Sequence, residues 1–344
     1  MNRLAPLVVG AAGLLAWAVL LLIAPAPALQ GWLIAFVFWA SIPLGALGVV
    51  LIHRLTGGDW GDAFAPELEP AAATAPLLLL FVLPVLIGLP LIYPWAAHPI
   101  EDASTRFWLL NPIAWIVRTL IALLGWAAIS RALPRIEGPR GRLAAGLALC
   151  FHTVAGCVLV VDWILSVKPH YTSSASGMDF TITQFAAALA WAGLEARERA
   201  RRSPAGDLSQ LLFAAVLAVG YLGFMSYLVV WYGDRPDPDG WYRTRLSEGW
   251  GWMPLAVVGL GFLSTAALLG LSSRIGVRRA LQLGGGTALA GVLLYDVWLL
   301  APAFGAACLP AAACALVGLG GVWVSAVGGL PRLGERLGAL SHAR

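Results

Sequence analysis

Ten apolar segments, each of roughly 20 residues, constrain the fold of this chain more than any other feature of its sequence. An α-helix needs about 20 apolar residues to cross the hydrocarbon core of a bilayer. The segments cover residues 5–24, 31–53, 74–93, 112–131, 141–163, 178–196, 209–232, 250–271, 280–300 and 304–326. The sequence therefore predicts an all-α polytopic membrane protein of about ten transmembrane helices, with residues 1–344 forming a single membrane domain.

The composition excludes a soluble globular fold. Of the 344 residues, 60% are hydrophobic and only 12% are charged, whereas soluble domains carry about 25% charged residues. The chain also contains 16 Trp residues, a residue type that membrane–water interfaces favour. The polar stretches at 57–69 and 233–249 have the length of loops, so we expect no separate soluble domain.

The ends of several helices can be predicted from local signals. The first apolar segment follows a lone Arg3, as in a signal peptide, but a second apolar segment comes directly after it without a convincing A-x-A cleavage site. We therefore expect a transmembrane helix there. Asn111 followed by Pro112 predicts a helix start, with Asn as the N-cap and Pro as the first helical residue.

Lys and Arg residues predict the orientation in the membrane, because cytoplasmic loops carry an excess of them. With the N-terminus inside, 16 of the 22 basic residues fall on the inner side and five on the outer side, while Arg118 lies within a helix. The outer five are Arg106, Lys168, Arg235, Arg243 and Arg245. We expect a multi-pass protein of the bacterial inner membrane with both termini in the cytoplasm. The net charge of +4 then reflects topology and indicates no nucleic-acid partner.

Cysteine and histidine spacing indicates that this chain holds no metal or haem of its own. The four Cys residues lie in apolar segments and form neither C-x-x-C nor C-x-x-C-H. The five His residues include no pair on one helix, as a bis-His haem would need. No Walker, Rossmann or zinc-protease motif is present. Small apolar packing residues are the simplest interpretation of the cysteines.

Ionisable side chains inside predicted membrane helices are costly and are therefore functional candidates. They are Arg118, His152, Asp162, Asp179 and Asp296. Arg118 lies about 9 Å into its helix, on the same face as Asn111 and Trp115, and Asp162 is the carboxylate closest to it in sequence on the next antiparallel helix. Two interpretations stay open for this pair, a structural Arg–Asp clamp and a proton or quinone role. A lone membrane His such as His152 is either a hydrogen-bonded packing residue or a ligand. Together the five residues predict a proton-conducting path.

The predicted outer loops carry motifs of a known family. Asp162-Trp163-Ile164-Leu165-Ser166-Val167-Lys168-Pro169-His170-Tyr171, followed by Thr172-Ser173-Ser174, resembles the D-W-x-x-S-x-x-P-H-W-x-S-T stretch of ActF-type membrane subunits of alternative complex III, the quinol:cytochrome c oxidoreductase. Leu55–Gly61, Tyr93–Ala96, and Trp231–Pro236 with Trp241-Tyr242 are similar to that family in the same order. Pro76 and Pro84 also fall at expected places. The resemblance spans about residues 50–250.

The resemblance implies an NrfD-like fold, two four-helix bundles plus two extra helices, in a subunit that holds no redox centre. It implies as partners an ActC-like membrane subunit, an iron–sulfur subunit and multihaem c-type cytochromes, whose haem c and iron–sulfur clusters would carry the electrons. This chain would anchor those outer-face subunits and conduct protons or contribute a quinone site. Lys168 stands where the family has an acidic residue, and Tyr171 where it has Trp.

Two groups of site residues follow from these considerations. The candidates for a proton path or a position near quinone are Arg118, His152, Asp162, His170, Asp179 and Asp296; a quinone needs hydrogen-bond partners at its two oxygens. The candidates for partner docking on the outer loops are Trp95, His98, Lys168, Tyr171, Trp231, Tyr232, Asp234 and Trp241. For His170, docking of a partner subunit stays open beside a redox-linked role.

Two other classes of function remain open at this point. A secondary transporter would show an inverted repeat with broken helices meeting at the midplane, whereas the polar residues here gather in the predicted outer half. A purely structural membrane anchor has no sequence feature that separates it from the respiratory subunit.

Overall fold

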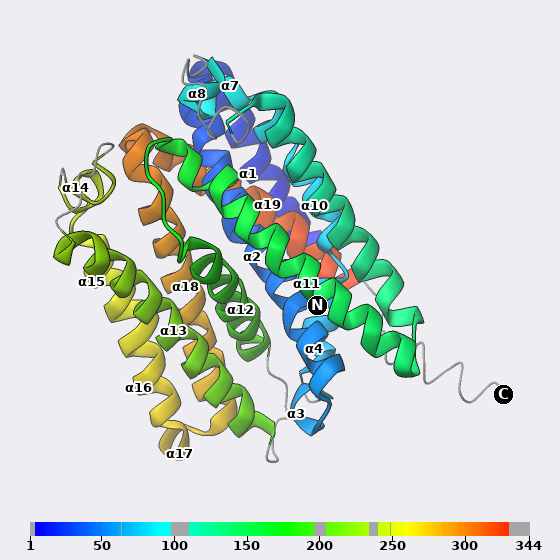
Figure 1. Cartoon of the computed structure of the whole chain (residues 1–344). Helices are drawn as coiled ribbons and strands as arrows, with labels where there is room; N and C mark the ends of the chain where they lie inside the picture. The colour runs from blue at the N-terminus through cyan, green and yellow to red at the C-terminus, as the bar shows by residue number, and fades with distance from the viewer. Residues whose placement is uncertain are drawn as a thin grey trace.

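The computed structural model describes residues 4–62, 64–97, 110–195, 204–233, 240–247 and 249–329, and the regular elements in these ranges are all helical (Figure 1). Within them, nine helices are long and apolar enough to cross a membrane. The chain is therefore an integral membrane protein of the all-α class, as the sequence predicts.

The N-terminal half builds the first group of helices. It begins with α1 (Leu4–Ile23) and α2 (Pro25–Thr56), continues through a series of short helices, and ends with α10 (Pro112–Ala132) and α11 (Gly138–Trp163). The short helices are α3 (Asp59–Asp62), α4 (Ala65–Ala72), η1 (Ala75–Leu77), α5 (Leu78–Phe81), α6 (Leu83–Ile87), α7 (Leu89–Ile92) and α8 (Pro94–Ala97), with η2 (Leu133–Arg135) and η3 (Leu165–Val167) after α10 and α11.

The C-terminal half builds the second group. Its long helices are α12 (Ser176–Leu194), α13 (Pro204–Tyr232) and α18 (Val277–Phe304), and α19 (Leu309–Gly329) closes the described chain. Shorter elements lie between them: α14 (Trp241–Leu246), α15 (Met253–Ala256), η5 (Val257–Leu263), α16 (Ser264–Gly270), α17 (Ser272–Ile275) and η6 (Ala306–Cys308). α15, η5 and α16 run on as one membrane span with a π-helical centre.

The packing of the helices divides the molecule into two groups joined at its centre. α2 packs against α4 and α11, and α10 packs against α11, while α12, α13, α16 and α18 pack against one another. α12 also packs along α2, which connects the groups. α1 and α19 pair with each other and lie against α2.

α12 is the segment that makes the difference between the ten predicted spans and the nine found in the described part of the chain. It is a helix, but it is 19 residues long and is not among the nine that are apolar enough to span a membrane by themselves. Most of its residues are buried against other helices, so it needs no lipid-facing surface. In Figure 1 the segment after α11 descends from the end of the molecule that carries α14 toward the middle, where α12 begins.

Proline divides the third predicted segment, 74–93, into short helices. Pro76, Pro84 and Pro90 each stand at the N1 or N2 position of a new turn, because proline has no N–H to donate to the preceding turn. The continuous apolar span begins earlier than predicted, at Ala65, and ends at Ile87.

Glycine allows α2 and α12 to approach closely. A Cβ atom at Gly45 would lie 1.9 Å from the backbone oxygen of Gln184. Small residues at helix interfaces in membranes permit this kind of backbone contact. The α2–α12 interface therefore depends on the absence of a side chain at Gly45.

Candidate functional site

Arg118 and Asp162 form a two-pronged ion pair between α10 and α11. Arg118 Nε donates to Asp162 Oδ2 over 2.8 Å, and Nη2 donates to Oδ1 over 2.7 Å. The Asp162 side chain is 1% exposed and that of Arg118 is 22% exposed. A fork-to-fork geometry of this kind fixes both side chains and stabilises each charge. The pairing of Arg118 with Asp162 that the sequence led us to expect is present.

The motif around Asp162 is tied to α10 by further hydrogen bonds. Trp115 donates its indole N–H to the backbone oxygen of Asp162 over 2.8 Å, as its position on the Arg118 face of the helix predicts. Trp163 donates to Thr119 Oγ1 over 3.1 Å. Asn111 caps α10 as expected, accepting hydrogen bonds from the N–H groups of residues 113 and 114.

The Tyr93–Ala96 segment contacts the Asp162–Tyr171 segment beside the Arg118–Asp162 ion pair. Tyr93 donates its hydroxyl hydrogen to the Trp163 backbone oxygen over 3.1 Å, and Trp95 donates its indole N–H to the Ser166 oxygen over 3.0 Å. Ser166 in turn donates to the Asp162 oxygen over 2.5 Å. We call the set Tyr93, Trp95, Trp115, Arg118, Asp162, Trp163 and Ser166 the motif knot.

Asp179, Tyr295 and Asp296 form a second polar centre between α12 and α18. The Tyr295 hydroxyl donates to Asp179 Oδ2 over 2.6 Å. The carboxyl groups of Asp179 and Asp296 are close enough to interact electrostatically. Asp296 is 2% exposed. Asp179 Oδ1 and Asp296 Oδ2 are buried and have no hydrogen-bond partner among the described residues. Because buried polar atoms are normally hydrogen-bonded, these two oxygens mark a place where a donor is missing.

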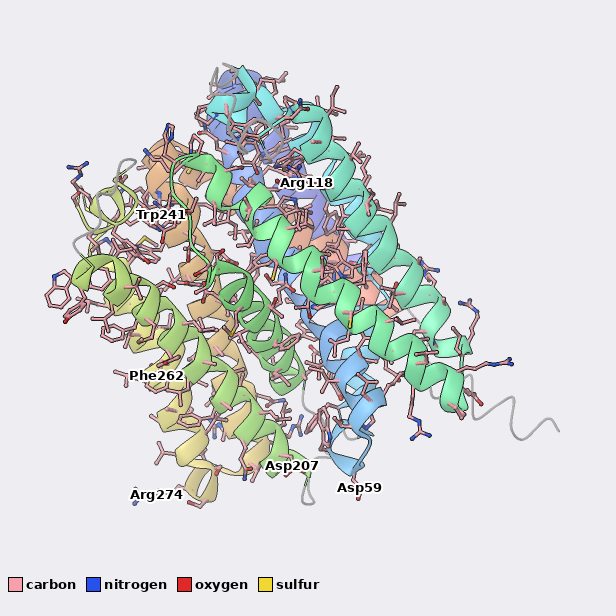
Figure 2. All side chains as sticks on the ribbon, in the orientation of Figure 1. Asp59, Arg118, Asp207, Trp241, Phe262 and Arg274 are labelled. Atoms are coloured by element: carbon pink, nitrogen blue, oxygen red, sulfur yellow. The ribbon has the colours of Figure 1, made fainter. Side chains whose placement is uncertain are left out.

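Aromatic rings cover this carboxyl centre on the side of α14. Tyr171, in the segment that descends to α12, stacks on Trp241 with ring centroids 4.3 Å apart. Arg245 also lies over the Trp241 ring, with its guanidinium carbon 3.2 Å from the ring centroid. Figure 2 labels Trp241, which belongs to α14. The Tyr242 ring in turn packs against the rings of Tyr227 and Trp298.

Arg245 holds α14 on α18. Its guanidinium donates to the backbone oxygens of Trp241 and Leu299, and the Trp298 indole donates to the Arg245 oxygen over 3.1 Å. The side chain is 0% exposed. The sequence prediction treated Arg245 as an ordinary loop charge, whereas it is a buried anchor; the neighbouring Trp-Tyr pair was the available signal, since Arg stacks on aromatic faces.

Tyr242 keeps its proton across the ordinary pH range. Burial raises the pKa of its hydroxyl well above the usual value, with smaller contributions in the same direction from the neighbouring Tyr171 and Asp179. The Tyr171 hydroxyl donates to the Tyr242 oxygen over 3.5 Å. Tyr242 therefore acts as a neutral hydrogen-bonding group beside the carboxyl centre.

His152 lies apart from both polar centres, in a mostly aromatic environment. Its ring is 1% exposed, stacks with Phe185 at 6.2 Å and lies 5.8 Å from the Trp126 ring. Its Nδ1 atom and the nearby α12 residue Gln184, at Nε2, have no hydrogen-bond partner among the described residues. His152 is thus packed among aromatic rings, with no hydrogen bond at its Nδ1 atom from the described residues.

The predicted docking residues fall into different environments. Trp231 and Tyr232 are 65% and 85% exposed, whereas Trp95 and Trp241 are each 2% exposed and are bound within the chain. His170 is exposed, and Lys168 and Tyr171 are half-buried. His98 and Asp234 lie outside the described residues.

Comparison with known proteins adds no assignment. No family model matches this chain, and no curated protein matches it. Within the described ranges, no group of three or more His, Cys, Asp or Glu residues is placed to hold a metal ion. The side chains described above can carry proton exchange and hydrogen bonding at the carboxyl centre, and charge pairing at the motif knot.

Proposed function

We propose that this chain is an ActF-like membrane subunit of a quinol-oxidising respiratory electron-transfer complex. The observation that carries the proposal is the convergence of three motifs of the resemblance, which are far apart in sequence. Tyr93 and Trp95 donate hydrogen bonds to the start of the Asp162–Tyr171 motif. Tyr171, at the end of that motif, stacks on Trp241 of a third motif. The remaining motif, Leu55–Gly61, lies elsewhere in the molecule. There His53 Nε2 is 2.9 Å from the Gly58 backbone oxygen.

The end of the molecule with α8 and α14 faces the outside in this proposal. Trp241 and Arg118 are labelled toward that end in Figure 2, and Asp59, Asp207 and Arg274 toward the other. The arginine-rich connections 131–142 and 274–279 would then face the cytoplasm of a bacterial inner membrane. The exposed rings of Trp231 and Tyr232 form the contact surface for outer-face iron–sulfur and multihaem cytochrome subunits, beside an ActC-like membrane subunit.

The two polar centres have separate roles in this proposal. Both carboxylate oxygens of Asp162 accept hydrogen bonds from Arg118, and this ion pair stabilises the motif knot. The carboxyl centre has unsatisfied acceptor oxygens and is the part of the predicted path suited to proton exchange. Haem c and iron–sulfur clusters of the partners carry the electrons.

Purification of the tagged chain from its native membrane tests the proposal. Under mild detergent we expect it to co-purify with polypeptides that carry haem c and iron–sulfur clusters, seen by difference absorption and electron paramagnetic resonance spectra. Recovery of the chain by itself, with substrate transport in reconstituted vesicles, would refute the proposal and favour a transporter.

A further inference from the structure

Exposed arginines gather at the turn between α10 and α11, at the end of the molecule that faces the cytoplasm in the proposed orientation. They are Arg131, Arg135, Arg140 and Arg142, and we call their side chains the arginine cluster. None of the four forms an ion pair with a residue that the structure describes. Glu137 is the one acidic residue in this stretch, so the turn carries a net positive charge. In Figure 1 the turn lies at the edge of the molecule, on the side away from α13 and α16.

Hydrogen bonds to the backbone hold this turn in place. Arg54, on α2, donates to the backbone oxygens of Leu133 and Ile136 over 2.8 and 3.3 Å. The guanidinium of Arg135 donates to the backbone oxygen of Arg131, in the last turn of α10. The arginine cluster is therefore presented by a turn that is fixed to α2.

The exposed face of α10 is apolar until it reaches the cluster. Its large exposed side chains are, in order, Ile113, Val117, Ile121, Leu124 and Arg131. They follow one another at spacings of four, four, three and seven residues, so they lie on one face of the helix. This face therefore changes from apolar to cationic only at the end of α10.

The exposed face of α11 has the same arrangement from the opposite direction. Arg140 is followed at helical spacing by Leu143, Leu147 and Val154, which are 66%, 65% and 63% exposed. Such side chains suit contact with lipid hydrocarbon, and an arginine next to them places its charged group at the level of the lipid head groups. Two neighbouring helices thus carry a lipid-facing surface that ends in guanidinium groups.

The arginines that open α18 lack such a surface. Arg278 and Arg279 are exposed and follow Arg274, which Figure 2 labels at the same end of the molecule as Asp59. Beyond them, Leu283 is the one large apolar side chain that α18 exposes, and every residue of α18 is described. The remainder of α18 packs against α12, α13, α16 and η5. Positive charge is common to both places, and the apolar faces distinguish the arginine cluster.

We propose that the arginine cluster binds the phosphate group of an anionic phospholipid of the cytoplasmic leaflet, whose acyl chains lie along the exposed faces of α10 and α11. A guanidinium matches the oxygens of a phosphate through two parallel hydrogen bonds. Groups of basic residues directly beside a membrane helix attract anionic lipids, with a contribution from each Arg. An acidic cytoplasmic protein would meet the same charges but would make no use of the apolar faces that lead up to them.

Native mass spectrometry of the full-length chain in a neutral detergent tests this site. The probe is dioleoyl phosphatidylglycerol, with dioleoyl phosphatidylcholine as the matched lipid without net charge. We expect the anionic lipid to bind at least roughly tenfold tighter, since each Arg contributes about 1 kcal/mol. Arg131→Gln with Arg140→Gln should remove this preference, whereas the matched control, Arg278→Gln with Arg279→Gln, should keep it.

The variant Arg131→Lys with Arg140→Lys separates lipid binding from an effect on membrane insertion. It keeps the positive charges that set the topology, and we expect it to keep most of the preference for the anionic lipid. Loss of the preference in both the Gln and the Lys variants would also fit the proposal only if phosphatidylglycerol with a photoreactive head group still cross-links to residues 131–142 of the parent chain.

Three results would overturn the site. They are equal affinity of the parent chain for the two lipids, equal loss in the two Gln variants, and cross-links confined to segments other than residues 131–142. A hexaglutamate peptide that displaces the lipid at equal concentration would assign the arginine cluster to an acidic protein partner instead. None of these measurements involves a redox partner, so their outcome is independent of the proposed respiratory function.

Discussion

Asp162 joins α10 to α11 through both its carboxylate and its backbone oxygen. The carboxylate pairs with Arg118, and the backbone oxygen accepts from Trp115 and Ser166. Because the carboxylate is buried and its partner is only partly exposed, removing one charge leaves the other without compensation in a poorly solvated place. We therefore expect the Arg118–Asp162 pair to contribute mainly to the stability of the fold.

Asp162→Asn should lower the free energy of unfolding by roughly 2–3 kcal/mol, somewhat below the cost for a fully buried pair. Thermal unfolding of the detergent-solubilised chain measures this. The double variant Arg118→Leu with Asp162→Leu should recover most of the lost stability, because it removes both charges. A single variant as stable as the parent would contradict the clamp.

The sequence predicts this pair well and the carboxyl centre only in part. Arg118 and Asp162 are on consecutive helices, so spacing alone brings them together. Tyr295 and Asp179 are 116 residues apart, and their contact depends on how α12 packs against α18, which no local pattern indicates. The burial of Trp95 and Trp241 was likewise hidden, because an aromatic residue in a loop motif looks the same whether it packs inward or faces a partner.

At the scale of elements, α12 is the helix on which the two groups depend. The apolar segment 178–196 predicts this helix and its approximate bounds, yet its central position arises from packing against α2, α18, α13 and α11. The π-helix η5 includes Gly261, which lies in close contact with Gly291 of α18. The approximate number of helices was therefore predictable, whereas the breaks within them and the way they pack were not.

Gly45→Ala should separate α2 from α12, since the added Cβ would lie 1.9 Å from the Gln184 oxygen. Overpacking usually costs about 1–3 kcal/mol, and a backbone obstacle places this variant at the upper end. The matched control is Gly270→Ala, which has open space and should be neutral or slightly stabilising. Equal thermal stability of the two variants would show that the α2–α12 interface accommodates the added methyl group, which would contradict this prediction.

At the scale of the whole molecule, the orientation in the membrane can be tested by cysteine labelling. In a background with Cys150, Cys157, Cys308 and Cys314 replaced by Ala, Ser174→Cys should react with a membrane-impermeant maleimide added to intact spheroplasts, because Ser174 is exposed and lies outside the proposed docking rings. Asp59→Cys should react only after the membrane is opened. The reverse pattern would invert the topology and place the motif knot at the cytoplasmic face.

The exposed rings at the end of α13 are the surface where partner binding is tested. Trp231→Ala with Tyr232→Ala should reduce the amount of co-purified partner subunits while the chain remains folded and inserted. Tyr221→Ala is the matched control, because Tyr221 is on the same helix and is 58% exposed. Equal recovery of partners with both variants would remove these rings from the docking surface.

The central claim is that this chain belongs to a complex that oxidises quinol, and the most direct measurement is quinol-driven haem reduction in the purified material. Decyl-benzohydroquinone is added to the affinity-purified native assembly under anaerobic conditions, and the haem c absorption bands are followed. The account predicts reduction of haem c that is lost when the preparation comes from cells without this chain. Material without haem, or haem that quinol leaves oxidised, would contradict it.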